Sequence, residues 1–395
     1  MSKTEIPSIR FHGFDDAWEQ RKVSELFRVT RGYVLAATQT ETTKTDEKPY
    51  PVYSSQTKDK GLMGYYKDYL YEDAITWTTD GANAGTVNYR AGKFYCTNVC
   101  GVLLSNEVKA NQMIAEALDS VAKGYVSYVG NPKLMNNVMA DIVIQIPTQA
   151  EEREQLSSFF AKLDNLITLH QRKFEKLTNV KKSMLKKMFP QNGSSYPEIR
   201  FKGFTDPWEQ RKAIDIADYS KGNGYSKGDL TDAGTPIILY GRLYTKYQFA
   251  ISEVDTFAVP RNGAVYSQGN EVIVPASGET AEDIARASAV EKSGVLLGGD
   301  LNILRPFDFI NPLFLALAIS NGEPQKELAK KAQGKSVVHI HNTDIQEVTI
   351  AYPSRTEQDR IVSVFCQLDH LITLHQRELE KLQSIKKALL EKMFV

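Results

Sequence analysis

The sequence predicts an α+β protein in which two mixed α/β domains are separated by two long helices that pair as an antiparallel, pseudo-two-fold coiled coil. Three observations support this prediction: a short repeated block, a longer repeated helical block, and an unlike region within each half. A length of 395 residues fits several domains better than one. With 42% hydrophobic residues the chain can bury folded cores, which excludes a globally disordered protein.

Two blocks of sequence occur twice. IRFHGFDDAWEQRK at 9–22 recurs as IRFKGFTDPWEQRK at 199–212, with 11 of 14 positions identical. LDNLITLHQRKFEKLTNVKKSMLKKMF at 163–189 recurs as LDHLITLHQRELEKLQSIKKALLEKMF at 368–394, with 18 of 27 identical. A repeat of this kind indicates tandem duplication. The regions between the blocks do not align convincingly, so divergence is confined to the middle of each half.

The repeats also set the predicted domain boundaries. A Gly- and Ser-containing linker, QNGSSYP, separates the two halves. In chain order we expect a first domain with its short entry segment, a first helix, the linker, a second domain with the repeated entry segment, and a second helix: 1–148, 149–190, 191–197, 198–352 and 353–395.

The helical blocks carry a heptad pattern. A 3.5-residue apolar period sustained over about five heptads indicates a coiled coil, with helices on the order of 55 Å long. Lys181 and Lys386 place polar groups at matching seam positions, where they can fix the register. We interpret the two seam histidines as structural core residues. The predicted core consists of Phe160, Leu163, Ile167, His170, Phe174 and Leu177, with Phe365, Leu368, Ile372, His375, Leu379 and Leu382.

A second apolar stripe runs beside this seam. It comprises Leu166 and Leu169 in the first helix and Leu371 and Leu374 in the second. One interpretation is that a partner helix packs beside the pair. The six lysines in the last half of the first helix favour a solvated face that complements the helix dipole, with phosphate contact as the alternative.

The two divergent regions read as α+β domains of ordinary size. Strands joined by Gly, Asn and Asp turns are expected within 74–90 and 93–104, and a helix at 112–123. The second region offers turns at 221–229, a strand at 271–277 and a helix at 312–320.

Charge gives no support to nucleic-acid binding by the chain as a whole. Lys plus Arg and Asp plus Glu both total 48, and neither divergent region is basic. Any DNA contact would therefore come from polar and basic residues clustered on loops, which suit base edges and phosphates. The candidates are Tyr53, Ser54, Ser55, Gln56, Thr57, Lys58, Lys60, Thr79, Asn83, Arg90, Lys93, Lys221, Asn223, Tyr225, Lys227, Arg242, Tyr244, Thr245, Lys246, Gln333 and Lys335.

Motifs for catalysis or metal binding are broken or missing. Asn311-Pro312-Leu313-Phe314 departs from the Asn-Pro-Pro-Phe/Tyr motif of adenine methyltransferases, and we interpret it as a Pro-opened helix start. Gly334-Lys335-Ser336 lacks the upstream glycine of a P-loop, because Ala329 stands there. Cys96 and Cys100 have no nearby Cys/His pair, so we expect no metal site. The sequence also contains no nucleophile–base signature, so we expect no catalytic residue.

The expected location is the cytoplasm. The longest apolar stretch, 313–319, is far shorter than a membrane span, and the first residues contain no apolar signal segment. Three cysteines, an odd number, favour a reducing compartment over a disulfide framework.

The repeated blocks resemble the specificity (S) subunit of type I restriction–modification systems. LD-[NH]-LITLHQR…EKL…KK…KMF is similar to that family's central and C-terminal conserved regions, and FxGF-x-D-x-WEQRK is similar to the entries of its target recognition domains. TTDGANAGTV and KGNGYSKGDL also resemble elements of such domains. The resemblance covers essentially the whole chain, and the duplication makes it specific.

This resemblance implies a non-catalytic DNA-binding subunit of a restriction system. It would read an asymmetric bipartite site in double-stranded DNA, one half-site per recognition domain, with the coiled coil setting the unread spacer. Two methyltransferase (M) subunits and ATP-dependent restriction/translocase (R) subunits would be its partners. Adenosylmethionine, ATP and Mg would be bound by those partners, and no cofactor by this chain. The alternatives are a coiled-coil scaffold that never touches DNA and a self-contained DNA modification enzyme with degenerate motifs.

Overall fold

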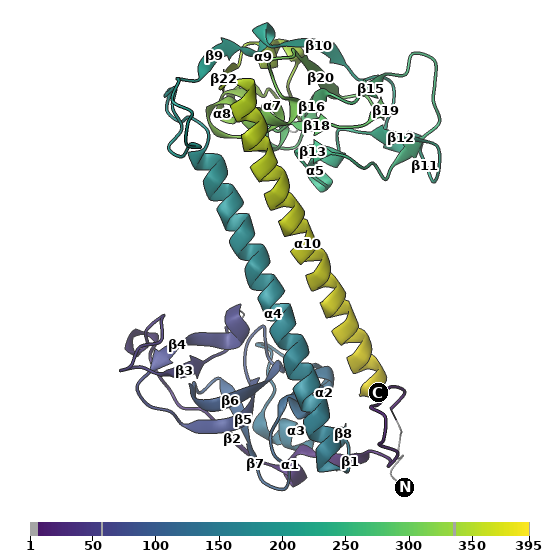
Figure 1. Cartoon of the computed structure of the whole chain (residues 1–395). Helices are drawn as coiled ribbons and strands as arrows, with labels where there is room; N and C mark the ends of the chain where they lie inside the picture. Colours follow the sequence, from purple (N-terminus) through teal and green to yellow (C-terminus); the bar gives the residue numbers. More distant parts are fainter. Residues whose placement is uncertain (1–6, 57, 335–336, 395) are drawn as a thin grey trace. The chain divides into compact units, whose positions relative to one another are not determined.

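The computed structural model, which describes residues 7–56, 58–334 and 337–394, divides into two units. Unit 1 contains 1–172 and 376–395, and unit 2 contains 173–375. Two long helices, α4 (Ala150–Lys187) and α10 (Arg355–Met393), are each unbroken (Figure 1). Each unit therefore combines one mixed domain with the start of one long helix and the end of the other.

A six-stranded sheet forms the centre of unit 1. Its strand order is β2-β7-β5-β6-β3-β4, and the strands pair antiparallel except for the parallel pair β3–β6. The expected strands within 74–90 and 93–104 are present as β5, β6 and β7. The strand bounds are β2 (Phe27–Arg31), β3 (Tyr50–Tyr53), β4 (Leu62–Tyr66), β5 (Tyr71–Thr78), β6 (Val87–Cys96) and β7 (Cys100–Ser105).

Helix α2 (Gln112–Ala122) packs its apolar face on this sheet, where the sequence pattern predicts a helix. Asn111 caps it, because its side-chain oxygen accepts a bond from the Ile114 N–H at 3.1 Å. The rest of unit 1 comprises β1 (Glu19–Lys22) paired with β8 (Val143–Ile146), α1 (Val23–Leu26), α3 (Asn136–Asp141) and the 3-10 turns η1 (Ala37–Gln39), η2 (Lys58–Gly61) and η3 (Lys123–Tyr125).

Unit 2 is built from shorter strands in two five-stranded sheets, of orders β10-β20-β16-β18-β13 and β11-β14-β12-β19-β15. The first sheet contains β10 (Ala217–Lys221), β13 (Ala250–Ile251), β16 (Glu271–Pro275), β18 (Ser288–Val290) and β20 (Leu301–Pro306). The second contains β11 (Leu230–Thr231), β12 (Thr235–Ile238), β14 (Phe257–Ala258), β15 (Tyr266–Gln268) and β19 (Ser293–Leu297). Two further pairs are β9 (Glu209–Lys212) with β22 (Thr349–Tyr352) and β17 (Ser277–Gly278) with β21 (Val338–His339).

One helix of unit 2 packs on its first sheet, against β16, β18 and β20. The apolar segment expected to be helical forms α7 (Pro312–Ile319), and Asn311 caps it by accepting from the N–H groups of Leu313 and Phe314. The Asn-Pro-Leu-Phe segment is thus a helix start. The other helices are α5 (Arg242–Thr245), α6 (Ala281–Ile284), α8 (Gly322–Lys331) and α9 (Asn342–Gln346), with 3-10 turns η4 (Ala213–Asp215) and η5 (Lys227–Asp229).

The two domains share a backbone turn although their sequences do not align. The Gly32 N–H donates to the carbonyl of Cys100 at 2.9 Å, and the Gly222 N–H donates to that of Leu301 at 3.0 Å. Both glycines follow the first strand of their sheet, and at both a Cβ would collide with backbone; at Gly32 it would lie 2.2 Å from the carbonyl oxygen of Cys96. Divergence of the middle regions therefore preserved at least this strand-to-loop turn.

Within each unit, α4 and α10 run antiparallel. In unit 1, Phe160 packs near Phe394 while Asp164, one turn later, pairs with Lys386. In unit 2 the pair Lys181–Asp369 lies at 2.5 Å. These two ion pairs are equivalent under the 205-residue repeat. All twelve predicted seam residues are buried or partly buried.

Each domain is clamped by the end of the other half's helix. In unit 1 the Trp18 ring lies 5.6 Å from that of Phe394, and in unit 2 the Trp208 ring lies 5.9 Å from that of Phe189. A buried ion pair completes each clamp, Arg10 with Glu152 and Arg200 with Glu357, and its nitrogen–oxygen distances are 2.7–2.8 Å. None of these aromatic or ionic contacts involves the divergent loops.

Over the described residues, no helix is both long and apolar enough to cross a membrane. The same part of the chain contains no group of three or more His, Cys, Asp or Glu residues that could hold a metal ion. Cys96, Cys100 and Cys366 are free thiols.

Candidate nucleic-acid interface

Several loops of unit 1 are bonded to one another, and we call the described residues 54–56, 58–61, 79–86 and 97–99 the first rim. Backbone and side-chain bonds connect them. The Thr79 N–H donates to the carbonyl of Val99 at 2.9 Å, and the Asn83 amide donates to the carbonyl of Ser55 at 2.9 Å. The Thr97 N–H donates to the carbonyl of Tyr53. Most of the first domain's candidate DNA contacts therefore belong to one connected surface.

Arg90 supports this rim from beneath instead of reaching outward. Its guanidinium lies 3.7 Å from the ring centre of Tyr53, and donates to the hydroxyl of Thr76 at 3.0 Å and to the carbonyl of Lys60 at 2.7 Å. Burial lowers the pKa of Arg90. Together with Gln56 and Asn83 it lines a small polar cavity of about 110 Å³ under the loop. As a buried brace, Arg90 positions the loop.

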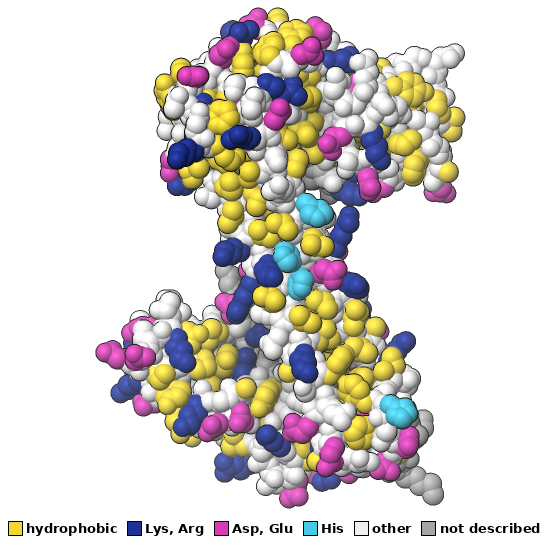
Figure 2. All heavy atoms as spheres, viewed as in Figure 1, with side chains coloured by type: hydrophobic (Ala, Val, Ile, Leu, Met, Phe, Trp, Pro, Cys, Tyr) yellow, Lys and Arg dark blue, Asp and Glu magenta, His cyan; other side chains and the backbone are white. Residues whose placement is uncertain are grey.

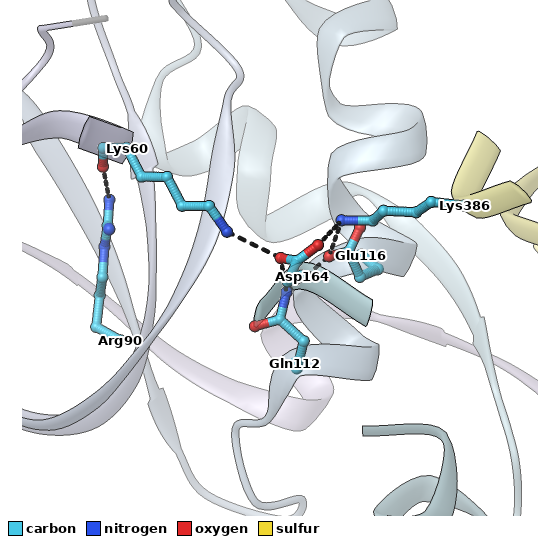
Figure 3. Close-up of polar contacts among 6 residues, drawn as sticks. All are labelled: Lys60, Arg90, Gln112, Glu116, Asp164 and Lys386. Carbon is cyan, nitrogen blue, oxygen red and sulfur yellow. Dashed lines mark hydrogen bonds and ion pairs between the residues drawn. The ribbon is translucent and has the colours of Figure 1, made fainter. Parts of the chain in front are cut away.

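The loop ends in a strained turn at Lys60. Asp59 and Lys60 have φ angles of 48° and 52°, in the left-handed region that non-glycine residues seldom occupy. The Lys60 ammonium, which is largely exposed, donates to Asp164 of α4 at 2.8 Å (Figure 3). The rim is thus tied to the helix as well as to its own sheet.

Asp164 is the centre of a charge cluster. Lys386 of α10 bonds both Asp164 at 2.7 Å and Glu116 of α2 at 2.6 Å, and Gln112 donates to both carboxylates (Figure 3). We call Lys60, Gln112, Glu116, Asp164 and Lys386 the helix node. It joins the first rim, α2 and both long helices within unit 1, and it borders a pocket of about 610 Å³.

Burial and pairing act in opposite directions in the helix node. Burial outweighs the bonds from Lys386 and raises the pKa of Glu116. Burial also acts to raise the pKa of Asp164, but the bonds from Lys386 and Lys60 lower it overall. Burial acts to lower the pKa of Lys386, yet its two carboxylate partners raise it. Lys386 is therefore held charged between two carboxylates.

A second rim occurs in unit 2, formed by the loops 221–229, 259–264 and 298–300. The Asn223 amide donates to the carbonyl of Gly263 at 2.9 Å. The Tyr225 hydroxyl is buried here: it donates to the carbonyl of Val259 at 3.2 Å and accepts from the Arg261 N–H at 2.8 Å. Asn223 and Tyr225 thus hold the rim together, while Lys221 and Lys227 are exposed on it.

The other candidates of unit 2 have different partners. The side chains of Arg242 and Lys246 are both paired with Asp255, and these bonds lower the pKa of that carboxyl well below its usual range. The Tyr244 hydroxyl donates to the carbonyl of Ser277, and the Thr245 hydroxyl bonds its own helix at Gly241. All four side chains thus bond groups outside the second rim, and that of Lys246 is 55% exposed.

The remaining candidates lie away from the rims or outside the described residues. Lys93 is exposed, with its ammonium 4.6 Å from the ring centre of Tyr69. Gln333 pairs with His339 through backbone bonds. Thr57 and Lys335 lie outside the described residues, and of Lys58 only the backbone is described.

Surface charge is mixed on the visible face of each unit. Figure 2 shows Lys and Arg interspersed with Asp and Glu over both, in keeping with the zero net charge of the chain. On this face, electrostatic attraction to phosphates would thus act locally and not through a broad basic field.

Sequence reasoning missed several residues of these surfaces. Arg261 stacks over Tyr225 at 5.2 Å and bonds Asp229, but no motif marks it. The helix node was detectable in part, because Asp164 and Lys386 belong to the repeated blocks. Glu116 lies in a divergent region, where no repeat points to it, and Lys60 was expected only as a candidate DNA contact.

The duplicated frame, with one loop rim on each unit, defines a protein with two candidate recognition surfaces. A family model described as the type I restriction modification DNA specificity domain matches the chain twice, at residues 15–179 and 205–384. A protein named as the N-terminus of a type I specificity subunit of Mycoplasma pneumoniae is 37% identical over 131 residues, 32% of this chain and 68% of that protein. In three further Mycoplasma pneumoniae relatives the match spans 39%, 53% and 65% of the relative's length.

Two comparisons extend over nearly the whole chain. The MjaVIII specificity subunit of Methanocaldococcus jannaschii is 20% identical over 393 residues, covering 94% of this chain and 91% of that one. The crystal structure of a type I restriction–modification S subunit from M. genitalium matches with a TM-score of 0.70 at 14% identity, covering 99% of both chains, and shows the same fold. This chain belongs to the family of type I restriction–modification specificity subunits, which are non-catalytic.

Proposed function

We propose that this chain is the subunit that selects the DNA sequence for a type I restriction–modification complex in the cytoplasm. It binds an asymmetric bipartite site in double-stranded DNA, and each domain reads one half-site. The observation that carries this proposal is the double match to a DNA specificity domain, on two domains that share a frame but differ in their rim loops. Two unlike readers on one frame suit two unlike half-sites, as a symmetric dimer suits a palindrome.

The paired helices set the length of the unread spacer in this proposal. Helices of 38 and 39 residues are about 57 Å long at 1.5 Å per residue, which spans more than one turn of DNA. Each residue added to a helix rotates the rest of that helix by about 100°. Only insertions close to a whole number of turns should therefore let both domains still recognise their half-sites.

The long helices also offer a surface for partner subunits. Leu166 and Leu169 in unit 1 are each 46% exposed, and Leu371 and Leu374 in unit 2 are 40% and 44% exposed. Apolar residues three apart on a helix suit docking of another helix. We propose that this stripe binds two methyltransferase subunits. The ATP-dependent restriction subunits then join the resulting complex. Adenosylmethionine, ATP and Mg are then bound by those partners.

The test is a strand-resolved adenine methylome. Cells without native methylation express this chain with and without its cognate methyltransferase subunit. The expected result is a two-part asymmetric motif with an unread gap that appears only when both proteins are present. Leu166→Glu together with Leu371→Glu should abolish methylation by preventing assembly, whereas Val180→Glu, also on an exposed helix position, should not.

The alternatives predict different outcomes. Methylation by this chain without its partner would make it a modification enzyme. A verified complex that produces no motif, and binds DNA without a salt-dependent affinity, would leave a scaffold that does not touch DNA.

A further inference from the structure

A short hairpin beside the first rim, residues 127–133, exposes two adjacent apolar side chains. Val129 is 92% exposed, the largest value for a bulky hydrophobic residue in the described part of the chain, and Tyr128 is 71% exposed. Single exposed hydrophobic residues are common on protein surfaces. Here two neighbours are exposed together at the tip of an ordered hairpin.

The hairpin is held rigidly. Ser127 and Lys133 exchange backbone bonds in both directions at 2.9 Å, which closes its base. The Gly81 N–H donates to the carbonyl of Pro132, and the Leu134 N–H to that of Thr79, both at 2.9 Å. A tip fixed by four backbone bonds presents its side chains with little further loss of backbone entropy on binding.

These bonds also join the hairpin to the first rim, because Gly81 and Thr79 belong to the loop 79–86. The apolar tip therefore projects beside hydrogen-bonding groups such as the Lys133 ammonium, which is half exposed. Apolar side chains next to polar and basic groups are the combination that minor-groove proteins use to enter between base steps.

The second domain has a backbone bridge at the equivalent place. Gln333 and His339 exchange backbone bonds across an interval of the same length, and the Ile340 N–H donates to the carbonyl of Ala276 as Leu134 does to Thr79. The sequences between the two bridges, YVGNP and GKSVV, have nothing in common. Equal backbone anchors that flank unlike sequences are expected of elements that meet unlike DNA sequences.

We propose that the 127–133 hairpin inserts into duplex DNA, with the Tyr128 ring stacking against a base of the half-site that the first domain reads and Val129 filling the space beside it. This inference rests on the proposed function and adds a stacking element to it. The ligand is the exposed face of a base at a partly unstacked step, and neither a phosphate nor a protein partner.

The test uses the full chain assembled with its methyltransferase subunits and a duplex that carries the motif found by methylome mapping. Tyr128→Ala should weaken binding about 5- to 150-fold, the range for loss of one stacked base. The dependence of log Kd on log salt should keep its slope, because no phosphate contact is lost. Tyr128→Phe should restore affinity, since the ring is retained.

The matched control is Tyr196→Ala, which removes a side chain of the same type, 54% exposed, from the linker between the repeats. It should leave Kd unchanged. The methylome of Tyr128→Ala should show relaxed sequence at one half-site only.

Unchanged affinity and motif for Tyr128→Ala would overturn the inference, and so would a loss of methyltransferase binding at unchanged DNA affinity, which would make the tip a protein contact. A change in salt slope would assign the tip to the phosphates instead. Failure of the proposed function is distinguishable, because the unsubstituted complex would then yield no bipartite motif.

Discussion

Replacing Lys386 by Met should destabilise unit 1 far more than replacing its repeat equivalent, Lys181, destabilises unit 2. Lys386 bonds two carboxylates whose side chains are only 8% and 13% exposed, those of Glu116 and Asp164. Lys181 bonds one, that of Asp369, which is 31% exposed. The two substitutions are chemically identical and differ only in what they leave unpaired.

The size of the effect follows from these contacts. At an effective dielectric constant of about 20, each Lys386 bond has a gross attraction of about 6 kcal/mol, most of which offsets desolvation. Removing one partner of a buried pair costs about 3–5 kcal/mol. Because Asp164 keeps its bond from Lys60, we expect the lower end, about 3 kcal/mol, for Lys386→Met. The partly exposed pair in unit 2 should cost about 1 kcal/mol.

The difference should depend on pH. Burial already raises the pKa of Glu116, and loss of Lys386 should raise it further. A carboxyl group whose pKa is higher in the folded state than in the unfolded state destabilises the fold as pH rises through that interval. The extra cost of Lys386→Met should therefore be full at pH 7 and shrink as the pH falls toward the unfolded carboxyl pKa.

Hydrogen exchange measures each unit separately, through amides of α2 for unit 1 and of α7 for unit 2. Opening free energies of both variants at pH 5 and pH 7.5 give the comparison. Equal losses in the two variants, or a Lys386→Met loss that does not shrink at pH 5, would refute the argument that unpaired buried carboxylates cause it.

Three other outcomes are expected. Gly32→Ala should unfold or strongly destabilise the first domain, since its Cβ would lie 2.2 Å from a backbone oxygen, whereas Gly124→Ala, with nothing within 4 Å, should be nearly neutral in thermal melts. Four residues inserted near Glu175 should lengthen the spacer in the methylated motif while both half-sites survive; an unchanged spacer would remove the helices as its ruler. Burial raises the pKa of Cys100 to about 11 and that of Cys96 further, so iodoacetamide at pH 8 should label both only after unfolding, as mass spectrometry of native and denatured chain can check.

The sequence was informative where a period or a repeat was present. The heptads indicated both long helices and the seam, including the positions of Lys181 and Lys386, because a coiled coil repeats one local geometry. The capped start of α7 was also readable, since Asn followed by Pro suits the first turn of a helix. Such signals are local and do not depend on distant parts of the chain.

The domains were much harder to read. Gly32 and Gly222 are equivalent because each makes the same backbone hydrogen bond. Many different sequences can form such a bond, so comparing the two divergent regions by sequence does not show the equivalence. Arg90 was expected to contact DNA because Arg often does, but burial under Tyr53 makes it a brace. The role of such a residue depends on which loops pack together in the folded domain. Strands as short as two residues have no recognisable sequence pattern, so the sequence does not predict which loops will be neighbours.

The two clamps have a consequence for how the protein changes over generations. Trp18 and Phe394, like Trp208 and Phe189, come from repeated blocks, so either helix end fits either tryptophan. A genetic exchange bounded by those blocks replaces a whole divergent domain and leaves the ring contact of each clamp chemically the same. Novelty in one domain then requires no compensating change in the other, and the lineage can sample new pairs of reading surfaces by shuffling instead of by gradual substitution.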